Sequence, residues 1–326
     1  MKILITGAAG FIGFHLCKNL ILRKNFFIYG IDNLNNYYDI SIKKDRLKIL
    51  KQFSNFKFFK TDICDSRKLS LIFKKNRFDV VVNLAAQAGV RYSIENPKEY
   101  LDNNIIGFYN ILENSKNFNI KHLIFASSGS VYGNSNSFPL EESENTNSPL
   151  SFYAATKKCN EIMAHSYSYI HNLKCTGIRF FTVYGPYGRP DMALFKFVKA
   201  ILNNKKLQLF NKGNHVRDFT YIDDAVDGIV KIILINKNNN NRIFNIFNIG
   251  SDNPQTLKRF LKIIEKKTNL RAKIENKPMQ LGDIYKTHAS IQLIKRVKNF
   301  KVSTNIETGI ENFLSWFKRY YSNGRK

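Results

Sequence analysis

The sequence is poor in several features that would point to particular classes of protein. It contains 4 cysteines, 7 prolines and 1 tryptophan among 326 residues. The cysteines (Cys17, Cys64, Cys159 and Cys175) show neither a Cys-x-x-Cys pair nor a His/Cys ligand spacing, which argues against a disulfide framework and against a metal site. Three of them fall within expected helices or strands, so we expect buried free thiols.

Long apolar runs are also missing. No apolar stretch approaches the roughly 20 residues that a membrane-spanning helix requires. Met1-Lys2 leads directly into an apolar strand, without a recognisable signal peptide. With 44% hydrophobic residues the chain can still bury a substantial core. We therefore expect a soluble, cytoplasmic protein with no membrane partner.

Acidic residues are scarce as well: 25 Asp and Glu stand against 51 Lys and Arg, which gives a formal net charge of +26. A strongly basic chain suggests a nucleic-acid partner. However, the lysines are spread along the whole chain, and basic stripes interleaved with aromatic residues are not evident. We therefore predict no nucleic-acid partner, although the charge could help to attract an anionic substrate.

What the sequence does contain is a regular alternation of apolar runs and helix-period segments. The expected strands are 2–6, 27–32, 56–61, 79–84, 122–127, 174–181 and 243–249, and the expected helices are 11–23, 65–75, 97–116, 151–169, 256–267 and 305–320. Near-continuous apolar strands separated by helices are typical of a doubly wound parallel sheet that is buried on both faces. A polar run at 236–242 indicates a surface loop.

A glycine-rich turn follows the first strand and opens the first helix: Gly7-Ala8-Ala9-Gly10-Phe11-Ile12-Gly13. Gly7 permits a tight turn, Gly10 lets the backbone approach a pyrophosphate, and Gly13 lets the helix pack on the sheet. The N-terminus of the helix then faces the phosphates. The GxxGxxG spacing is a variant of the dinucleotide fingerprint, and a tight turn without a ligand remains the alternative.

Acidic residues at the ends of the next two strands add to this pattern. Asp32 could accept hydrogen bonds from the adenosine ribose hydroxyls and would repel a 2′-phosphate, which favours NAD over NADP. Three downstream cations could weaken that preference: Lys43, Lys44 and Arg46. Asp62 could reach the adenine amino group, or it could cap the following helix.

Tyr153 and Lys157 lie four residues apart on an expected helix, so both side chains project from one face. Free tyrosine, with a pKa of about 10, is a poor base at neutral pH. A nearby ammonium group and a positively charged nicotinamide ring would favour the phenolate. Ser128, at the end of the fifth strand, could hydrogen-bond the same substrate hydroxyl. Such a pair alone is a common surface feature, but together with the glycine turn it indicates an active site built around a nicotinamide cofactor.

Two longer segments carry a resemblance to a known family: 84–93 (LAAQAGVRYS) and 179–193 (RFFTVYGPYGRPDMA). The chain resembles the extended short-chain dehydrogenase/reductase family almost end to end. Within that family it is most similar to the nucleotide-sugar epimerases of the UDP-glucuronate 4-epimerase branch. The α/β fold that this implies is a Rossmann-type doubly wound parallel sheet with a smaller C-terminal α/β substrate lobe. Residues 1–180, with later segments of about 215–250, would bind NAD, and 181–214 with 251–326 would bind the substrate.

By this resemblance Ser128, Tyr153 and Lys157 form the catalytic triad. Tyr153 would remove the proton from the sugar 4-hydroxyl while a hydride passes from C4 to NAD, and after the 4-keto sugar turns over the hydride returns to its opposite face. Lys157 would also hold the nicotinamide ribose, and Asn103 or Asn104 would order this network. The expected cofactor-binding residues are Gly7, Gly10, Phe11, Ile12, Gly13, Asp32, Asn33, Asp62, Ile63, Ala85, Ala86, Asn103, Tyr153 and Lys157.

The residues after Ser128 bear on the type of reaction. Related dehydratases and decarboxylases place acidic residues directly after the serine or threonine of the fifth strand, whereas this chain has Gly129-Ser130. The absence favours epimerisation without net oxidation. The resemblance places Ser130 and Thr182 near the sugar, where they would hold its C6 carboxylate, and Arg189 is nearby in sequence.

The nucleotide side of the substrate rests on fewer residues. Arg217 is a candidate for the UDP phosphates, although an ion pair with Asp218 or Asp223 would give it a purely structural role. Asp283 would meet the uridine ribose by resemblance. The chain departs from the branch pattern at two positions in the distal lobe: Leu281, where proline is usual, and Ser290, where aspartate is usual.

We therefore expect an NAD-dependent 4-epimerase that converts UDP-glucuronate to UDP-galacturonate. An epimerase of UDP-glucose or UDP-N-acetylglucosamine is the first alternative, and an NAD-binding regulator without catalytic activity is the second. The family resemblance further implies a homodimer formed through helices 97–116 and 151–169 of each subunit.

Overall fold

The computed structural model describes residues 1–234, 243–280 and 282–322. The predicted surface loop at 236–242 and the departure at Leu281 lie outside the described residues. Within them the strands are β1 (Lys2–Thr6), β2 (Phe27–Asp32), β3 (Phe56–Lys60), β4 (Val80–Asn83), β5 (His122–Ser128), β6 (Cys175–Phe180), β7 (Thr182–Tyr184), β8 (Lys206–Phe210), β9 (Val216–Tyr221), β10 (Phe244–Ile249), β11 (Pro254–Thr256) and β12 (Lys273–Lys277).

The helices of the same described residues cover these strands. They are α1 (Phe11–Ile21), α2 (Ile40–Leu50), α3 (Ser66–Asn76), α4 (Tyr92–Glu95), α5 (Pro97–Tyr100), α6 (Gly107–Asn117), α7 (Phe152–His171), α8 (Ala193–Leu202), α9 (Ile222–Ile233), α10 (Leu257–Thr268), α11 (Gln292–Lys298) and α12 (Ile306–Ser322).

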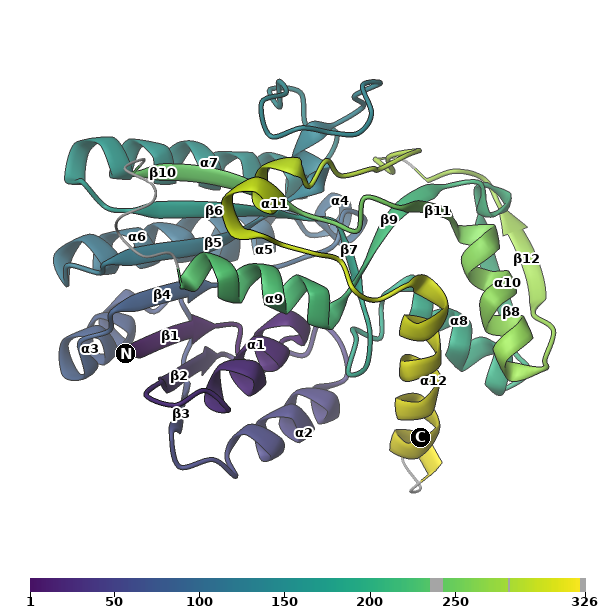
Figure 1. The fold of residues 1–326 in the computed structure, drawn as a ribbon, viewed down its shortest axis with the longest axis horizontal. Coiled ribbons are helices and arrows are strands. Elements are labelled where there is room, and N and C mark those ends of the chain that lie inside the picture. The colour runs from purple at the N-terminus through teal and green to yellow at the C-terminus, as the bar shows by residue number, and fades with distance from the viewer. Residues whose placement is uncertain (235–242, 281, 323–326) are drawn as a thin grey trace.

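A parallel sheet forms the centre of the fold. In the described part of the chain it has seven strands in the order β10-β6-β5-β4-β1-β2-β3. Helices α1, α2, α9 and α11 pack together on one face, and α3, α6 and α7 pack on the other (Figure 1). This confirms the predicted doubly wound α/β fold. The strand order reverses between β1 and β4, and such a reversal opens a crevice at the carboxyl ends of the strands.

The strands carry apolar residues on both faces because both faces are buried. Along β1, Ile3 and Ile5 belong to one apolar cluster, while Leu4 belongs to the cluster on the other side of the sheet. In β4, Val82 and Val81 divide between the same two clusters. This alternation follows from the two-residue period of a strand, and it explains why the sequence shows continuous apolar runs.

A second lobe stands beside the carboxyl edge of the sheet (Figure 1). It contains a small sheet in the order β11-β9-β7, the parallel pair β12-β8, and the helices α8, α10 and α12. Strand β10 returns to the main sheet beside β6, as predicted. One apolar cluster runs from α1 and α9 into the second lobe, where it includes Phe260 and Phe313. The predicted residue ranges of the two domains stay a prediction.

Two expectations about local structure were wrong. The segment 97–116 is not one regular helix, because Leu101–Ile106 forms a π-helical turn between α5 and α6. Such turns commonly occur where side chains are redirected at functional sites. In addition, Cys159 is exposed and Cys64 is only half-buried, whereas Cys17 and Cys175 are buried. Cys159 lies on the side of α7 that faces away from the sheet, since the buried positions of that helix include Lys157 and Asn160.

Candidate active site

A cavity of about 1070 Å³ opens at the carboxyl ends of the parallel strands, between the sheet and the second lobe. Apart from Asn104, every site residue predicted from the sequence lines this cavity, from the glycine turn at Gly7 to Asp283 in the second lobe. Segments that are far apart in the chain therefore meet in one site. The roles of the individual residues stay predictions.

The glycine turn has the geometry that a bound diphosphate needs. Gly7 has a φ of 69°, in the left-handed region, and a Cβ atom on Gly13 would lie 2.1 Å from the carbonyl oxygen of Gly7. Only glycine fits at both positions. Helix α1 begins at Phe11, and within the described chain no side chain caps its N-terminus and no acidic residue occupies its first turn. Its free N–H groups and positive end therefore face the cavity and suit an anion.

Asp32 is fixed directly beside this turn. Its buried carboxylate accepts hydrogen bonds from the backbone N–H of Ala9 at 3.1 Å and of Leu34 at 2.9 Å. Each carboxylate oxygen retains a further lone pair that can accept from ribose hydroxyls. Of the cations that could have favoured NADP, Lys43 donates to the backbone and side-chain oxygens of Asn35, and Arg46 is fully buried.

Asp62 is a cavity residue and not a helix cap. Its carboxylate accepts from Asn33 Nδ2 and from the backbone N–H of Cys64, each at 2.8 Å. Burial acts to raise the pKa of Asp62, but these hydrogen bonds outweigh it and hold the pKa below its usual value. Helix α3 is capped instead by Asp65, which accepts from the backbone N–H of Lys68. The alternative role of Asp62 as a cap was therefore wrong.

The predicted proton-transfer residues lie together on α7 and at the end of β5. Lys157 Nζ donates to the carbonyl oxygen of Ala126 at 2.9 Å, and burial lowers the pKa of Lys157 to about 8. Burial raises the pKa of Tyr153, while a hydrogen bond with Ser128 and the charge of Arg189 act in the opposite direction. Burial thus shifts both Tyr153 and Lys157 toward their neutral forms, so the Tyr153 phenolate needs a nearby positive charge before Tyr153 can act as a base.

The two asparagines expected to order this network, Asn103 and Asn104, make different contacts. Asn104 is buried in the π-helical turn, accepts from the backbone N–H of Gln87 at 2.8 Å, and donates to Thr156 Oγ1 at 3.0 Å. It therefore links the loop after β4 to the helix that carries Tyr153. Asn103 instead donates to the carbonyl oxygen of Glu99 at 2.8 Å and lines the cavity.

The candidate sugar-binding residues occupy the part of the cavity beside β7. Ser130 donates its backbone N–H to Ser128 Oγ at 3.1 Å, and Thr182 begins β7. Arg189 is paired with Asp191, with 3.0 Å between Arg189 Nε and Asp191 Oδ1. Tyr37 also donates its hydroxyl to Asp191, at 3.4 Å.

On the nucleotide side, Arg217 does not form an ion pair with Asp218 or Asp223 in the described structure. Its Nη1 donates to the carbonyl oxygens of Val216 at 3.0 Å and Tyr285 at 3.1 Å. The ion pair expected as the alternative for Arg217 was therefore wrong. Asp283 is paired with Arg91 at 3.4 Å, and the Arg91 guanidinium lies 4.5 Å from the centre of the Phe210 ring.

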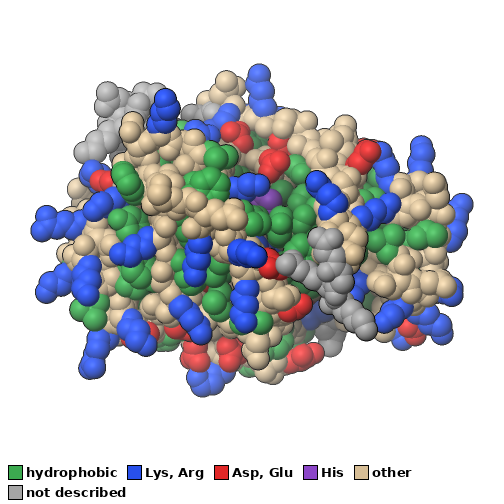
Figure 2. All heavy atoms as spheres, turned by 90° about the horizontal axis from the view of Figure 1, so that it is seen from below, with side chains coloured by type: hydrophobic (Ala, Val, Ile, Leu, Met, Phe, Trp, Pro, Cys, Tyr) green, Lys and Arg blue, Asp and Glu red, His purple; other side chains and the backbone are tan. Residues whose placement is uncertain are grey.

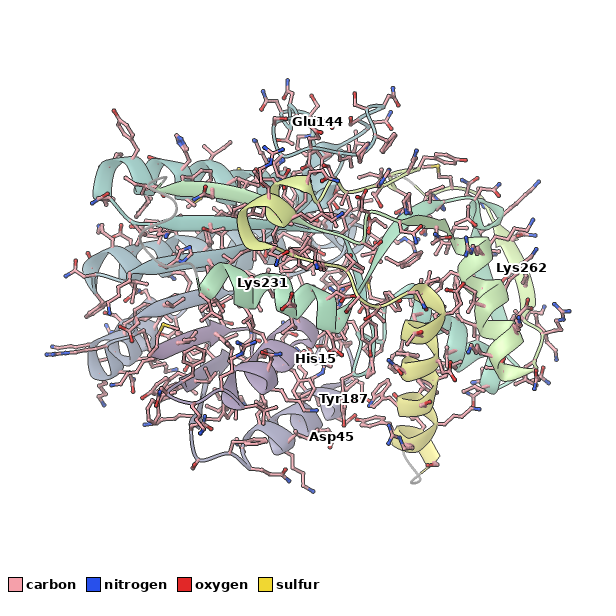
Figure 3. The ribbon with its side chains drawn as sticks, in the orientation of Figure 1. His15, Asp45, Glu144, Tyr187, Lys231 and Lys262 are labelled. Carbon is pink, nitrogen blue, oxygen red and sulfur yellow. The ribbon has the colours of Figure 1, made fainter. Side chains whose placement is uncertain are left out.

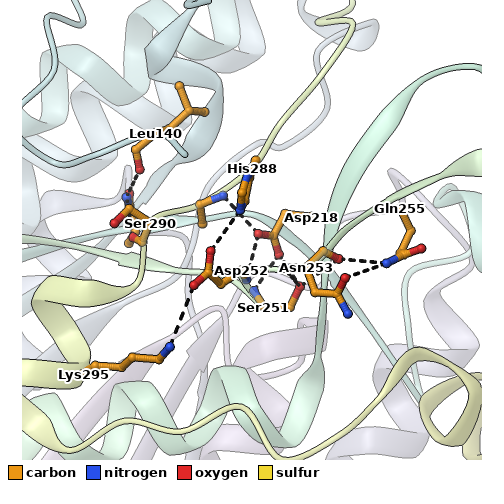
Figure 4. A network of polar contacts seen from close by, with 11 residues as sticks. Leu140, Asp218, Ser251, Asp252, Asn253, Gln255, His288, Ser290 and Lys295 are labelled. Atoms are coloured by element: carbon orange, nitrogen blue, oxygen red, sulfur yellow. Dashed lines mark hydrogen bonds and ion pairs between the residues drawn. The ribbon is translucent and has the colours of Figure 1, made fainter. Parts of the chain in front are cut away.

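Asp218, next to Arg217 on β9, has a separate function as a buried acceptor (Figure 4). It accepts from the N–H and hydroxyl of Ser251 and from the backbone N–H of Ala289, at 2.6, 2.7 and 3.0 Å. Nearby, Asp252 Oδ1 lies 2.9 Å from His288 Nε2, within hydrogen-bond distance. This network fixes β9 to two loops of the second lobe. Ser290, the second departure from the branch pattern, lies beside it and contributes backbone hydrogen bonds.

The family model described as "NAD dependent epimerase/dehydratase family" matches residues 3–250 of the chain. The chain belongs to this family. It is 48% identical to Protein CapI of Staphylococcus aureus, over 98% of this chain and 99% of that protein. It is 41% identical to a probable UDP-glucuronate 4-epimerase of Rhizobium meliloti, over 98% of each.

A solved structure agrees with these sequence relatives. The UDP-glucuronic acid 4-epimerase from Bacillus cereus, in complex with UDP-glucuronic acid and NAD, superimposes with a TM-score of 0.93. The two sequences are 33% identical, and the match covers 98% of this chain and 100% of that one. The predicted extended short-chain dehydrogenase/reductase fold and the nucleotide-sugar epimerase family are confirmed.

Sequence reasoning missed several residues of this family member's cavity. They include Tyr37, Gln87, Arg91, Asp191 and His215, all of which line it. Two signals could have found some of them: Gln87 and Arg91 lie inside the first family-like segment, and Asp191 lies two residues after Arg189 in the second. Tyr37 and His215 stand outside both segments, and only the packing of the lobes brings them to the site.

Proposed function

We propose that this protein is an NAD-dependent UDP-glucuronate 4-epimerase that interconverts UDP-glucuronate and UDP-galacturonate. The observation that carries the proposal is that Ser128, Tyr153 and Lys157 meet the glycine turn inside one cavity. Family membership supports the same chemistry. When bound, NAD supplies a reversible hydride acceptor for C4 of the sugar.

The residues of the chain handle the proton. Tyr153 takes it from the sugar 4-hydroxyl, Ser128 hydrogen-bonds the same oxygen, and the Lys157 ammonium stabilises the phenolate. When the keto sugar has turned over, Tyr153 returns the proton to the opposite epimer. No acidic residue directly follows Ser128, where Gly129 and Ser130 stand, so none is available there to promote elimination from the ring, and the sugar leaves with no net oxidation.

The fit of NAD to the site rests on two observations. The uncapped N-terminus of α1 offers free N–H groups for the diphosphate. The Asp32 carboxylate, fixed by Ala9 and Leu34, is placed for ribose hydroxyls and would repel the 2′-phosphate of NADP. Lys157 would hold the nicotinamide ribose.

The proposed preference for UDP-glucuronate rests on neutral hydrogen-bond donors that would hold the C6 carboxylate of the sugar. Ser130 and Thr182 can donate hydroxyl hydrogen bonds to the C6 carboxylate, and Arg189 lies nearby. Because Arg189 is already neutralised by Asp191, it would hold a second carboxylate loosely and leave the keto sugar free to turn over. The Bacillus cereus enzyme, solved with UDP-glucuronic acid and NAD, supports this choice. Arg217 would contact the UDP phosphates and Asp283 the uridine ribose.

We further propose a homodimer formed through the segment 97–116 and helix α7. Large apolar side chains are exposed along both: Leu101, Ile106 and Tyr109 on the first, and Ile162, Tyr169 and Ile170 on the second. An exposed apolar surface of this extent is characteristic of an interaction site. No helix in the described part of the chain is long and apolar enough to cross a membrane, and the cytoplasmic location stays a prediction.

The test is incubation of the purified protein with UDP-glucuronate, UDP-glucose and UDP-N-acetylglucosamine in separate reactions, followed by NMR of the products. We expect conversion of UDP-glucuronate to UDP-galacturonate without added NAD, because the cofactor is retained between turnovers. Preferential conversion of either neutral sugar would contradict the choice of substrate. No conversion of any of the three would favour the regulator.

A further inference from the structure

Arg46 is a buried arginine that lies outside the cavity and takes no part in the mechanism described above. It projects from α2, and its side chain is 0% exposed. Its Nη1 donates to the carbonyl oxygen of Ala9 at 2.7 Å and to the Tyr38 hydroxyl at 2.9 Å. Its Nη2 donates to the carbonyl oxygen of Tyr187 at 2.6 Å. The guanidinium thus joins two segments that are remote in the chain.

Both of these segments lead into the active site. Ala9 is part of the glycine turn, two residues before the start of α1. Tyr187 lies two residues before Arg189, in the loop between β7 and α8. The fork of a guanidinium can hold both segments at once, because its two terminal nitrogens point to different acceptors. A change in the position of Arg46 would therefore move the cofactor turn and the sugar-side loop relative to each other.

The Tyr187 loop needs such a contact. Tyr187 has a φ of 55°, a left-handed backbone conformation that residues other than glycine seldom adopt. A residue in this region keeps it only when its surroundings enforce it. The neighbouring Pro186 carbonyl oxygen is bound by His15 Nε2 at 2.9 Å, and His15 and Tyr187 are labelled beside α1 in Figure 3. Arg46 and His15 together anchor the loop.

The charge of Arg46 also favours a function beyond packing. No carboxylate of the described residues lies within ion-pair distance of it, and its Nε has no hydrogen-bond partner there. A buried cation without a counter-charge is costly, and a purely structural contact would be served more cheaply by an apolar side chain. The diphosphate that the glycine turn would receive is an anion. When bound, it would offset part of the buried positive charge of Arg46.

We propose that Arg46 is a positioning residue that locks the cofactor turn to the loop carrying Arg189. Its loss weakens the retention of NAD and the binding of the sugar together, although it touches neither. This inference rests on the proposed function for the identity of the sugar; the retention of NAD tests it independently.

The experiment compares Arg46→Met, Arg46→Lys and Arg23→Met in the full-length protein. Arg23 is exposed, and the one side-chain hydrogen bond described for it goes to Asn19, so Arg23→Met is the matched control. NAD per subunit is measured after gel filtration, and KM and kcat for UDP-glucuronate are measured at saturating NAD. We expect both Arg46 variants to bind NAD about tenfold more weakly or worse and to raise KM by a similar factor, because the buried hydrogen bonds that join Ala9 to Tyr187 are lost. Arg23→Met stays like the wild type.

The lysine variant shows whether the contact to both segments or only the positive charge of Arg46 is needed. One ammonium group keeps the cation but cannot reach both Ala9 and Tyr187, so full rescue of NAD retention and KM by Arg46→Lys overturns the proposal. Loss of NAD with an unchanged KM, or wild-type behaviour of both variants, also overturns it. If Arg46→Met does not fold, Arg46→Lys alone decides. A purely structural residue would lower the melting temperature and leave KM unchanged.

A double-mutant cycle tests the path through Arg189. In an Arg189→Met background, Arg46→Met should change the KM for UDP-glucuronate by less than about twofold, since two residues acting through one contact are not additive. An equal effect in both backgrounds overturns the proposed path. If the wild type fails to convert UDP-glucuronate, the proposed function fails instead, and NAD retention still decides the function of Arg46.

Discussion

Burial controls the proton chemistry of single residues in this site. The Lys157 side chain is buried, and its Nζ donates a hydrogen bond to the carbonyl oxygen of Ala126. The Tyr153 phenol is buried beside Ser128, which makes its phenolate costly until a positive charge arrives. The nicotinamide ring of bound NAD would be such a charge. Tyr153 is therefore expected to become a competent base when the cofactor is in place.

The first prediction concerns the Tyr153 hydroxyl. Tyr153→Phe should reduce the turnover of UDP-glucuronate by about 10²- to 10⁴-fold, the usual contribution of a general acid or base. NAD retained by the variant should stay at the wild-type level, because the ring remains in place. Tyr167→Phe is the control, since Tyr167 lies on the same helix but donates to Glu113. A Tyr153→Phe enzyme with full turnover would disprove the mechanism.

The second prediction concerns the pH dependence of stability. Burial lowers the pKa of Lys157 from 10.5 to about 8 in the folded protein. Between these two values the unfolded chain binds more protons than the folded one, so this residue makes stability rise with pH. At pH 7 the buried ammonium costs stability, and Lys157→Met should stabilise the cofactor-free protein by about 3 kcal/mol.

Denaturant unfolding of wild type and Lys157→Met at several pH values measures this effect. The difference in the free energy of unfolding should be largest at or below pH 8 and should shrink as the pH rises toward 10.5. A difference that is the same at pH 7 and pH 10 would show that the buried charge is not its cause.

At the scale of secondary-structure elements, helix α7 has two different faces. One buried face carries Tyr153 and Lys157 into the cavity and packs against β5 and the π-helical turn. The opposite face carries Cys159 and Ile162 toward solvent in the single chain. A dimer through this face would stiffen the helix that holds the proton-transfer residues.

The third prediction tests that dimer. Ile162→Glu places a charge in the centre of the proposed interface, where an unpaired buried charge is strongly unfavourable. We expect light scattering to show a dimer for the wild type and a monomer for the variant. Leu71→Glu on α3 is the matched control, because Leu71 is 50% exposed and Ile162 is 58% exposed. A monomeric wild type, or a dimer that survives Ile162→Glu, would contradict the proposal.

For the whole molecule, the excess of positive charge is a property of the surface. Figure 2 shows Lys and Arg side chains spread over the visible face, not gathered into one stripe. The net charge of +26 nevertheless creates a long-range positive potential. A substrate with a diphosphate and a uronate carboxylate would be attracted to the cavity mouth, and salt would screen this attraction.

The fourth prediction follows from that field. Raising the salt concentration from about 20 mM to about 300 mM at constant pH should lower kcat/KM for UDP-glucuronate several-fold, because the Debye length falls below the distances over which the surface acts. The value of kcat should change little. Steady-state kinetics measures both, with sucrose at matched osmolarity as the control. A kcat/KM that is independent of salt would rule out electrostatic attraction.

Much of this fold and site was predictable from the sequence, because the signals were local. The bounds of β1 and β2 matched the prediction, since an apolar strand buried on both faces needs a continuous apolar run. The turn at Gly7 and the four-residue spacing of Tyr153 and Lys157 are also local patterns, which can be recognised without knowing how distant segments pack. Helix α2 was missed because its segment is rich in lysine and has a weak apolar face. The strands of the second lobe were also missed, because they are short: β7, β8, β9, β11 and β12.

Taken by itself, the sequence determined the parallel sheet, the glycine turn and part of the set of residues that line the cavity. Only the tertiary structure decided that Arg46 reaches Tyr187, that Arg217 binds carbonyl oxygens, and that Cys159 faces solvent. Helix and strand periods report which face of an element is apolar. They do not report which distant segment a buried polar group meets, because that partner depends on how the lobes pack.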